Sequence, residues 1–271
     1  MSEGYAVFIP TRGRNAHLMM TVVAIMASKF PPSVIILVDN NDEPDTLRSE
    51  ESNIIVVRNE TDRKTDAAGS QIGLDWAASL GFETAVKWDD DLVPKPDCLG
   101  RLVNHVECGD TVAAGGLYPK DGEKRKTLWD KSSRFPIPAD GDSRHIQFFE
   151  VDPPCTNDLD LFYVRSLYSS FAFDVAAAFR IGGFHQGYSK HSFRHETDFT
   201  LRLNEADPEL STGGVNLIVD PQAVAIHRCL PGGVRGFDQK AAMEMRKSDQ
   251  ALFQYRLKTM KIDSEYWKVT T

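Results

Sequence analysis

The sequence predicts an α/β protein in which helices cover both faces of a mostly parallel central sheet. Over the first hundred residues, short apolar runs rich in β-branched residues alternate with segments of helical periodicity, a pattern typical of βαβ units. Residues 33–38, SVIILV, are almost wholly apolar, as in a strand that helices cover on both faces. Polar loops follow these runs, at the sheet edge where α/β proteins place their functional residues.

Length and composition indicate one globular domain over residues 1–271. The chain is 41% hydrophobic and 26% charged, and it is long enough to bury a substantial core. No apolar run approaches the ~20 residues of a transmembrane helix. The first ten residues lack the basic lead of a secretory signal. The four cysteines are widely spaced and form no Cys-x-x-Cys pair, which is typical of reduced thiols. We therefore expect a cytoplasmic protein without a cysteine-based zinc site.

The net charge of -8 argues against a protein that coats nucleic acid or an anionic membrane over its whole surface. Two segments are nevertheless basic. Residues 120–134 hold six basic and three acidic side chains, and residues 228–268 hold nine and five. Each segment is either a patch for an anionic ligand or a solvated basic face.

The elements follow from apolar runs, helical spacing and turn residues. In the first half we expect strands at 5–10, 33–38, 54–57, 84–88 and 112–118, with helices at 16–29 and 67–80. Residues 119–160 are polar and punctuated by Pro and Gly, which predicts a long insertion. Beyond it we expect an apolar run at 170–179, a helix beginning near Glu196, strands at 215–219 and 223–227, and an amphipathic helical tail at 237–266.

Three consecutive aspartates, Asp89, Asp90 and Asp91, end the strand at 84–88. If the extended backbone continues through them, Asp89 and Asp91 share one face and Asp90 points away. Paired carboxylates suit a hard divalent cation. A solvated acidic turn that caps the next helix is the other interpretation of the same residues.

The loop after the first strand carries Thr11, Arg12 and Arg14 directly before a helix. Backbone N–H groups at a helix N-terminus favour an anion such as a diphosphate, although the arginines could equally be surface residues. The loop lacks both the P-loop lysine and the three spaced glycines of a dinucleotide fingerprint. Asp39 ends the second strand, where it could accept hydrogen bonds from a ribose or form an Asx turn.

Seven stretches in a fixed order resemble the nucleotide-sugar glycosyltransferases of the GT-A fold, in particular the large inverting family 2. They are FIPTRGR, LVDNND, AAGSQIGLDWA, KWDDD, FRIGGF, HETDFTLRL and AIHR, and the resemblance covers residues 5–228. It implies a nucleotide-binding half at 1–118, an acceptor half at 119–228, and a lid loop with a C-terminal helical tail at 229–271.

The resemblance also implies which residues bind the donor and the metal. Asp89 and Asp91 would hold the metal and diphosphate, with His227 completing the shell. An imidazole among oxygen ligands suits Mn²⁺ better than Mg²⁺. The donor-binding residues it implies are Pro10, Thr11, Arg12, Arg14, Asp39, Gln71, Asp89, Asp90, Arg228 and Arg235.

The chain departs from the family pattern at two motifs. Where the family has Glu-Asp-x-Asp, this chain has His195, Glu196, Thr197 and Asp198. Alignment on Asp198 puts Glu196 at the catalytic position, so we expect Glu196 to be the general base and Asp198 the next candidate. At the second strand, Asp-Asn-Asn replaces the more common Asp-Asp-Gly, which weakens the expected nucleoside contact.

The expected function is metal-dependent transfer of a sugar from a nucleotide-diphosphate donor, with UDP as the first choice by family frequency, to an acceptor hydroxyl with inversion. The alternatives are a nucleotidyltransferase or other nucleotide-sugar enzyme, and a noncatalytic binding module. The expected acceptor is a glycan or small molecule, with an anionic polymer or modified DNA as alternatives suggested by the basic segments. Among the histidines, His185, His191 and His195 could bind the acceptor, and we expect no second metal site. Residues 230–237, LPGGVRGF, predict a lid.

Overall fold

The computed structural model describes residues 4–42, 47, 49–118, 161–164, 166–205, 217–228 and 238–260. The strands of this part form one continuous sheet in the order β3-β2-β1-β4-β8-β6-β9-β5, with β7 paired to β9. The strands are β1 Ala6–Thr11, β2 Val34–Asp39, β3 Ile54–Arg58, β4 Thr84–Lys87, β5 Leu92–Pro94, β6 Ala113–Leu117, β7 Phe162–Val164, β8 Phe171–Asp174 and β9 Leu217–His227. The helices are α1 Asn15–Met26, α2 Asp66–Ser79, α3 Cys98–Glu107, α4 Val175–Arg180, α5 His195–Glu205 and α6 Gln239–Thr259.

The order of the strands places a crevice between β1 and β4. β1, β2, β3 and β4 are parallel, and the chain runs outward from β1 to β3 before it returns through α2 to β4, on the other side of β1. At such a reversal the loops that follow the two central strands diverge and leave space between them. The loops after β1 and β4 are the two that carry the arginines and the aspartates.

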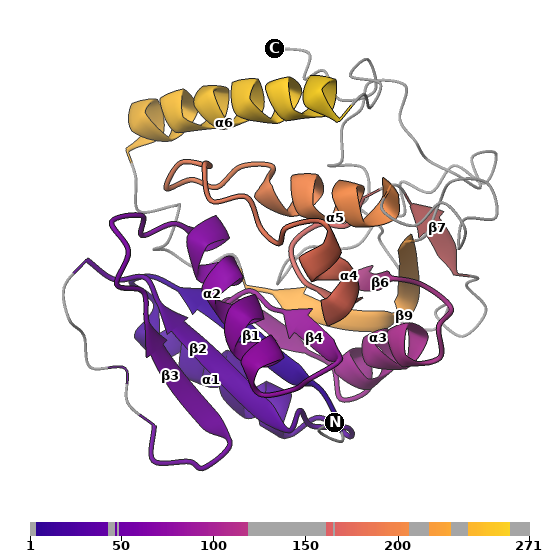
Figure 1. Cartoon of the computed structure of the whole chain (residues 1–271). Helices are drawn as coiled ribbons and strands as arrows, with labels where there is room; N and C mark the ends of the chain where they lie inside the picture. The colour runs from indigo at the N-terminus through magenta and orange to yellow at the C-terminus, as the bar shows by residue number, and fades with distance from the viewer. Residues whose placement is uncertain are drawn as a thin grey trace.

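Two layers of helices sandwich the sheet, as alternation along β1 shows (Figure 1). Ala6 and Phe8 pack in the core beneath α2, α4 and α5, whereas Val7 and Ile9 pack against α1 and α3. Gly73 lets α2 approach the sheet closely, because a Cβ there would lie 2.5 Å from the Phe8 ring. The predicted fold class, a mostly parallel sheet covered on both faces, is confirmed.

Helix α6 lies outside α5 and forms a further layer (Figure 1). Its buried residues Phe253 and Leu257 are one turn apart and pack with Leu201 of α5 and Ala67 of α2. The side chain of Asp238 accepts a hydrogen bond from the Ala241 N–H and caps the first turn. The amphipathic tail is therefore helical at 239–259, as predicted.

Some elements differ from the expected ones. The runs at 215–219 and 223–227 belong to a single strand, β9, which continues through Pro221. Beside the proline, the Asp220 carboxylate accepts a hydrogen bond from the Gln222 N–H at 2.8 Å. The run at 170–179 divides at Asp174 into β8 and α4, since the Asp174 carboxylate caps the helix through the Ala177 N–H. Strand β5 was not predicted.

Other expectations fall outside the described residues. These are the insertion at 119–160, the lid at 230–237 and Arg235 within it. Among the residues that the structure describes, no helix combines the length and apolar content that crossing a bilayer requires.

Candidate active site

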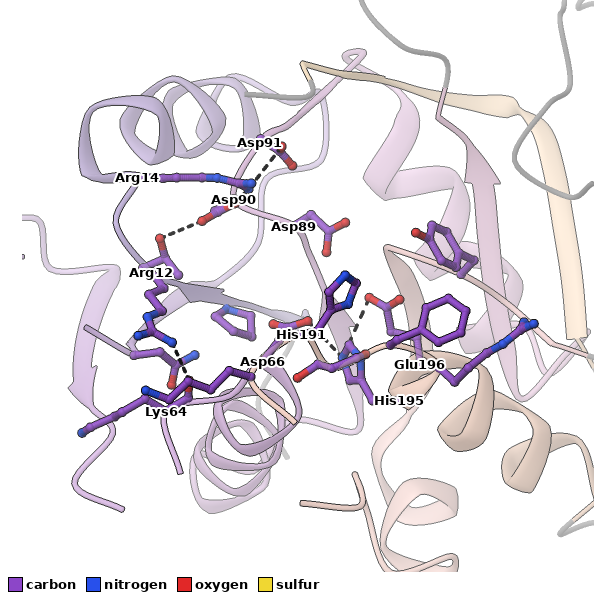
Figure 2. Close-up of a pocket in the computed structure, with 18 of the residues that line it drawn as sticks. Arg12, Arg14, Lys64, Asp66, Asp89, Asp90, Asp91, His191, His195 and Glu196 are labelled. Atoms are coloured by element: carbon purple, nitrogen blue, oxygen red, sulfur yellow. Dashed lines mark hydrogen bonds and ion pairs between the residues drawn. The ribbon is translucent and has the colours of Figure 1, made fainter. Parts of the chain in front are cut away.

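A cavity opens at the carboxyl ends of β1 and β4, between the N-terminal turns of α1 and α5 (Figure 2). Its lining is mostly charged or polar and includes both acidic and basic side chains. The lining residues are Pro10, Thr11, Arg12, Arg14, Asn40, Lys64, Asp66, Asp89, Asp90, Asp91, Tyr168, Lys190, His191, Ser192, Phe193, Arg194, His195, Glu196 and His227.

The three aspartates form a turn between β4 and β5, so the expected strand geometry is wrong. Asp90 and Asp91 both approach Arg14, whose Nη1 lies 2.6 and 3.1 Å from their carboxylate oxygens. The Thr11 hydroxyl donates to Asp90 at 2.9 Å. Burial raises the pKa of Asp90 to about 6, although Arg14 opposes the shift. Asp90 therefore anchors the arginine of the first loop.

Asp89 points the other way, which separates it from Asp91. Its Oδ1 lies 2.5 Å from the Lys87 ammonium, and its Oδ2 accepts a hydrogen bond from the Ser169 hydroxyl. Figure 2 shows Asp89 between two groups of side chains. Arg14 with Asp90 and Asp91 lies on one side, and Glu196 with His195 lies on the other. Both Asp89 oxygens are thus committed to protein partners, and Asp89 does not join Asp91 as the sequence suggested.

Asp91 instead meets His227 from the distant end of β9. Strand β5 follows Asp91 directly and pairs with β9 in a register that sets Leu92 opposite His227. The Asp91 Oδ1 and His227 Nε2 atoms lie 3.2 Å apart, and the Arg228 N–H donates to the Asp91 carbonyl at 2.9 Å. Adjacent ligands of one octahedral ion, each at about 2.1 Å, lie about 3.0 Å apart. The carboxylate and imidazole therefore fit a shared divalent cation.

The N-terminal turns of α2 and α5 converge on the other side of Asp89. Glu196 lines the cavity and its Oε1 accepts from the buried Lys87. Burial raises the pKa of Glu196, and Lys87 and His195 oppose this shift. Burial would lower the pKa of His195, yet Glu196 and Asp66 outweigh it and the pKa is raised. These contacts make the N-terminal turn of α5 the second charged wall of the cavity.

Three non-glycine residues with left-handed backbone border this site: Ser169 at φ 66°, Ser192 at φ 51° and Arg194 at φ 72°. Such conformations cost on the order of 1 kcal/mol each and persist where surrounding contacts enforce them. Asp249 of α6 supplies some of those contacts, since it accepts hydrogen bonds from the backbone N–H groups of Ser189 and Phe193 at 2.6 and 2.8 Å.

Several residues predicted for the site do not line the cavity. Asp39 is buried against Arg58 at 2.6 Å and forms an Asx turn with Asn41. Gln71 accepts from the Phe184 N–H, and Arg228 contributes its backbone N–H to the Asp91 carbonyl. His185 also lies outside the lining.

Asp198 needs a correction as a catalytic candidate. It is fully buried and does not line the cavity, because Arg202 and Arg256 take its two carboxylate oxygens, at 2.9 and 2.7 Å. Its place is in the packing of α5 against α6.

Several residues of the site were missed in the sequence, and Lys87 and Asp66 are two that contact Glu196 or its neighbour His195. Lys87 is fully buried, and the signal for it was a lysine inside the otherwise apolar strand TAVKW. Asp66 begins α2, and its Oδ2 lies 3.0 Å from His195 Nε2. No local sequence pattern predicts this contact.

Comparisons with known proteins bear on the family. The sequence profile described as glycosyl transferase family 2 matches residues 6–174. Polyprenol monophosphomannose synthase of Mycolicibacterium smegmatis is 28% identical over 130 residues, which cover 45% of this chain and 48% of that protein. The match thus spans about half of the length of this relative.

Solved structures show the same fold at low sequence identity. TarS of S. aureus in complex with UDP-GlcNAc has a TM-score of 0.62 at 12% identity, over 94% of this chain and 66% of that one. The mannosyltransferase PcManGT of Pyrobaculum calidifontis, with GDP-Man and Mn²⁺, has a TM-score of 0.58 at 13% identity, over 94% and 64%. GalNAc-T7 with UDP, GalNAc and Mn²⁺ gives 0.57 at 14% identity, over 90% and 47%.

Proposed function

Because the chain belongs to glycosyl transferase family 2, we propose that its cavity transfers a sugar from a nucleotide-diphosphate donor to an acceptor hydroxyl. One observation carries the proposal. A carboxylate–imidazole pair fit for a cation and a carboxylate fit for a base line the same cavity, one on each side of Asp89. A donor diphosphate needs the first, and an acceptor hydroxyl needs the second.

We propose that Asp91 and His227 hold Mn²⁺, or Mg²⁺ in its place. Bound there, the ion would offset the negative charge that grows on the departing diphosphate. The mixed oxygen and nitrogen ligands favour Mn²⁺. Two structural neighbours with Mn²⁺ beside a nucleotide or nucleotide sugar support this assignment.

The first loop would bind the nucleotide. Pro10 and Thr11 end β1 at the cavity, and Arg12 and Arg14 follow at the start of α1. Arginine suits a diphosphate because its planar guanidinium can donate two hydrogen bonds to one phosphate. We propose UDP as the nucleotide, supported by two neighbours that hold UDP or a UDP-sugar. A third neighbour holds GDP-Man, so GDP must be compared directly.

Glu196 would act as the general base in an inverting reaction. Its Oε1 is held by Lys87, and among the described residues none donates a hydrogen bond to Oε2. The Oε2 atom would accept the proton of the acceptor hydroxyl while the hydroxyl oxygen bonds to the anomeric carbon. The carbon–phosphate oxygen bond breaks on the opposite face, so the configuration inverts. A glycan or small molecule is the acceptor we propose.

The test measures nucleotide release and sugar transfer from UDP- and GDP-linked sugars, with Mn²⁺ and with EDTA. We expect release with a UDP-sugar that requires the metal, and a rise in melting temperature when UDP and Mn²⁺ are added together. Full turnover in EDTA would refute the metal, and a larger stabilisation by GDP would refute UDP. A transferred sugar with the same anomeric configuration as in the donor would refute inversion.

A further inference from the structure

Lys87 is fully buried behind the cavity lining, where each proton of its ammonium group has an acceptor. The acceptors are Asp89 Oδ1 at 2.5 Å, the Ser169 carbonyl at 3.0 Å and Glu196 Oε1. An ammonium has three donors, so none remains for a substrate. Lys87 therefore cannot bind donor or acceptor directly, and any part it takes in the reaction passes through these neighbours.

Several titratable side chains surround the Lys87 ammonium. Asp66 adds a third carboxylate, with its Oδ2 3.6 Å from the ammonium. His195 lies beside the same groups, with Nδ1 2.6 Å from the Ser192 carbonyl oxygen and Nε2 3.0 Å from Asp66 Oδ2. Glu196 and Asp66 raise the pKa of His195 although burial opposes the shift, which favours its charged form beside the carboxylates of Asp66, Asp89 and Glu196.

The same cluster offers metal-ligand atoms, but a cation is already in place. Suitable atoms of Asp66, His195 and Glu196 lie within 4.8 Å of one another. Lys87 sits among these carboxylates and supplies the positive charge that an ion would bring. Its four-carbon stem fixes that charge to β4, whereas a bound ion would carry no such tether.

We propose that Lys87 is a positioning residue for sugar transfer, which holds Glu196 through Oε1 and leaves Oε2 for the acceptor hydroxyl. The inference rests on the proposed function and extends it. The same ammonium binds Asp89 of the aspartate turn, so one cation ties the base on α5 to the turn that carries Asp91. The left-handed Ser169 contributes to both halves of this link, through its carbonyl to Lys87 and its hydroxyl to Asp89.

A positioning role predicts a selective kinetic loss. Without Lys87, Glu196 loses the hydrogen bond that fixes its Oε1 and the neighbouring carboxylates lose the ammonium between them, so proton acceptance in the chemical step suffers. Donor binding depends on Arg14, Asp91 and the first loop, which Lys87 does not touch. We therefore expect kcat to fall while KM for the donor is retained.

The experiment compares Lys87→Met with Arg256→Met. Arg256 is likewise the cationic partner of a buried carboxylate, Asp198, but it is only partly buried and lies outside the cavity lining. We expect Lys87→Met to lower kcat by about a hundredfold or more with the donor KM changed less than about threefold. Arg256→Met should lose melting temperature and keep kcat per folded molecule. A kcat loss that follows melting temperature equally in both variants would overturn the proposal.

A double-mutant cycle tests whether Lys87 acts through Glu196. In a Glu196→Gln background, Lys87→Met should reduce kcat by less than about threefold, because the group it positions has already lost its function. Full additivity of the two losses would overturn the proposal. Lys87→Met/Asp66→Asn is the second variant, for the case in which Lys87→Met folds poorly, because it also removes one of the carboxylates that the ammonium faces. This variant should regain melting temperature and not kcat, and recovery of kcat would show that charge balance alone suffices, contrary to a positioning role.

Failure of this inference differs from failure of the proposed function. If wild-type protein transfers no sugar from any UDP- or GDP-linked donor, the proposed function fails and the inference falls with it. If wild type transfers sugar and Lys87→Met does so at a similar kcat, the proposed function stands and only the role of Lys87 is refuted.

Discussion

At the scale of single residues, identical side chains acquire different roles from their neighbours. Asp89, Asp90 and Asp91 are consecutive, yet they face Lys87, Arg14 and His227 respectively. Burial raises the pKa of Asp90, and the Asp90 carboxylate forms an ion pair with Arg14. Asp91 has an imidazole beside it at metal-ligand spacing. The direction of each carboxylate, rather than its place in the motif, determines what it can do.

The first prediction concerns Asp91→Asn. The change is nearly isosteric and removes the charge that a divalent cation requires. We expect sugar transfer to fall by about a hundredfold or more, and Mn²⁺-dependent stabilisation by UDP to disappear while the fold is kept. Asp97→Asn is the control, because half of the Asp97 side chain is exposed and, among the described residues, its carboxylate pairs only with Lys29. Unchanged stabilisation by UDP and Mn²⁺ in Asp91→Asn would place the ion elsewhere.

A second prediction concerns Glu196→Gln. The amide keeps the shape of the side chain but cannot take a proton, so kcat should fall by a factor of about 10² to 10⁴ with donor affinity retained. The measurement is kcat and donor KM with a saturating acceptor, together with the binding of UDP by thermal shift. A rate equal to that of wild type would assign the base to another residue. Asp198 is a poor substitute, because two arginines occupy its oxygens.

At the scale of elements, strand β9 connects the candidate site with helix α3. Its last residue, His227, reaches the aspartate turn, while Asp220 near its start binds Arg101 and His105 of α3 at 2.8 and 3.0 Å. Burial alone would raise the pKa of Asp220, but the hydrogen bonds from His105 and Arg101 lower it. The hydrogen bond to Asp220 raises the pKa of His105, although burial opposes the shift. The α3–β9 contact is therefore an ion pair that responds to pH.

The third prediction follows from the sign of that shift. A histidine whose pKa is raised on folding stabilises the protein fully below its unfolded pKa of about 6.5 and loses the contribution as pH rises through the folded pKa. The free energy of unfolding of wild type, relative to His105→Gln, should therefore decline as pH rises from about 6 to about 9. Denaturant unfolding across this range measures it. A constant difference between the two proteins would contradict the shift.

At the scale of the whole molecule, local patterns predicted what depends on local sequence. Short apolar runs predicted β1 to β4, because a strand that is buried on both faces is apolar almost throughout, and helical spacing predicted α1 and α2. Thr11, Arg14 and Asp91 were predicted for the site because they follow strands, at the sheet edge where α/β proteins place functional residues, and because of the family resemblance; all three line the cavity.

Contacts between distant segments were less accessible. The direction of Asp89 depends on Ser169, eighty residues away, and Lys87 meets Glu196 across the space between β4 and α5. Asp198 looked catalytic because its motif was local, whereas its partner Arg256 comes from α6. Periodicity carries no information about such pairs, and the charged side chains that it leaves unexplained in buried segments are the signal to follow.

The last prediction asks whether α6 is part of one folding unit with the sheet. Phe253 is fully buried among Leu201, Tyr188 and Leu257, so Phe253→Ala should lower the free energy of unfolding by about 3–5 kcal/mol. Tyr255→Ala is the matched control, because Tyr255 is 66% exposed on the same helix and its loss should change stability by less than about 0.5 kcal/mol. If residues 1–271 form one domain, Phe253→Ala should unfold in a single transition, with the same lowered midpoint by far-UV circular dichroism and by tryptophan fluorescence. Trp88 is buried against the far face of the sheet, with α1 and α3, so it reports on a region remote from α6 once the other three tryptophans, Trp76, Trp129 and Trp267, are replaced by Phe in both proteins. A helical transition that moves alone, with the fluorescence midpoint unchanged, would make α6 a separate appendage.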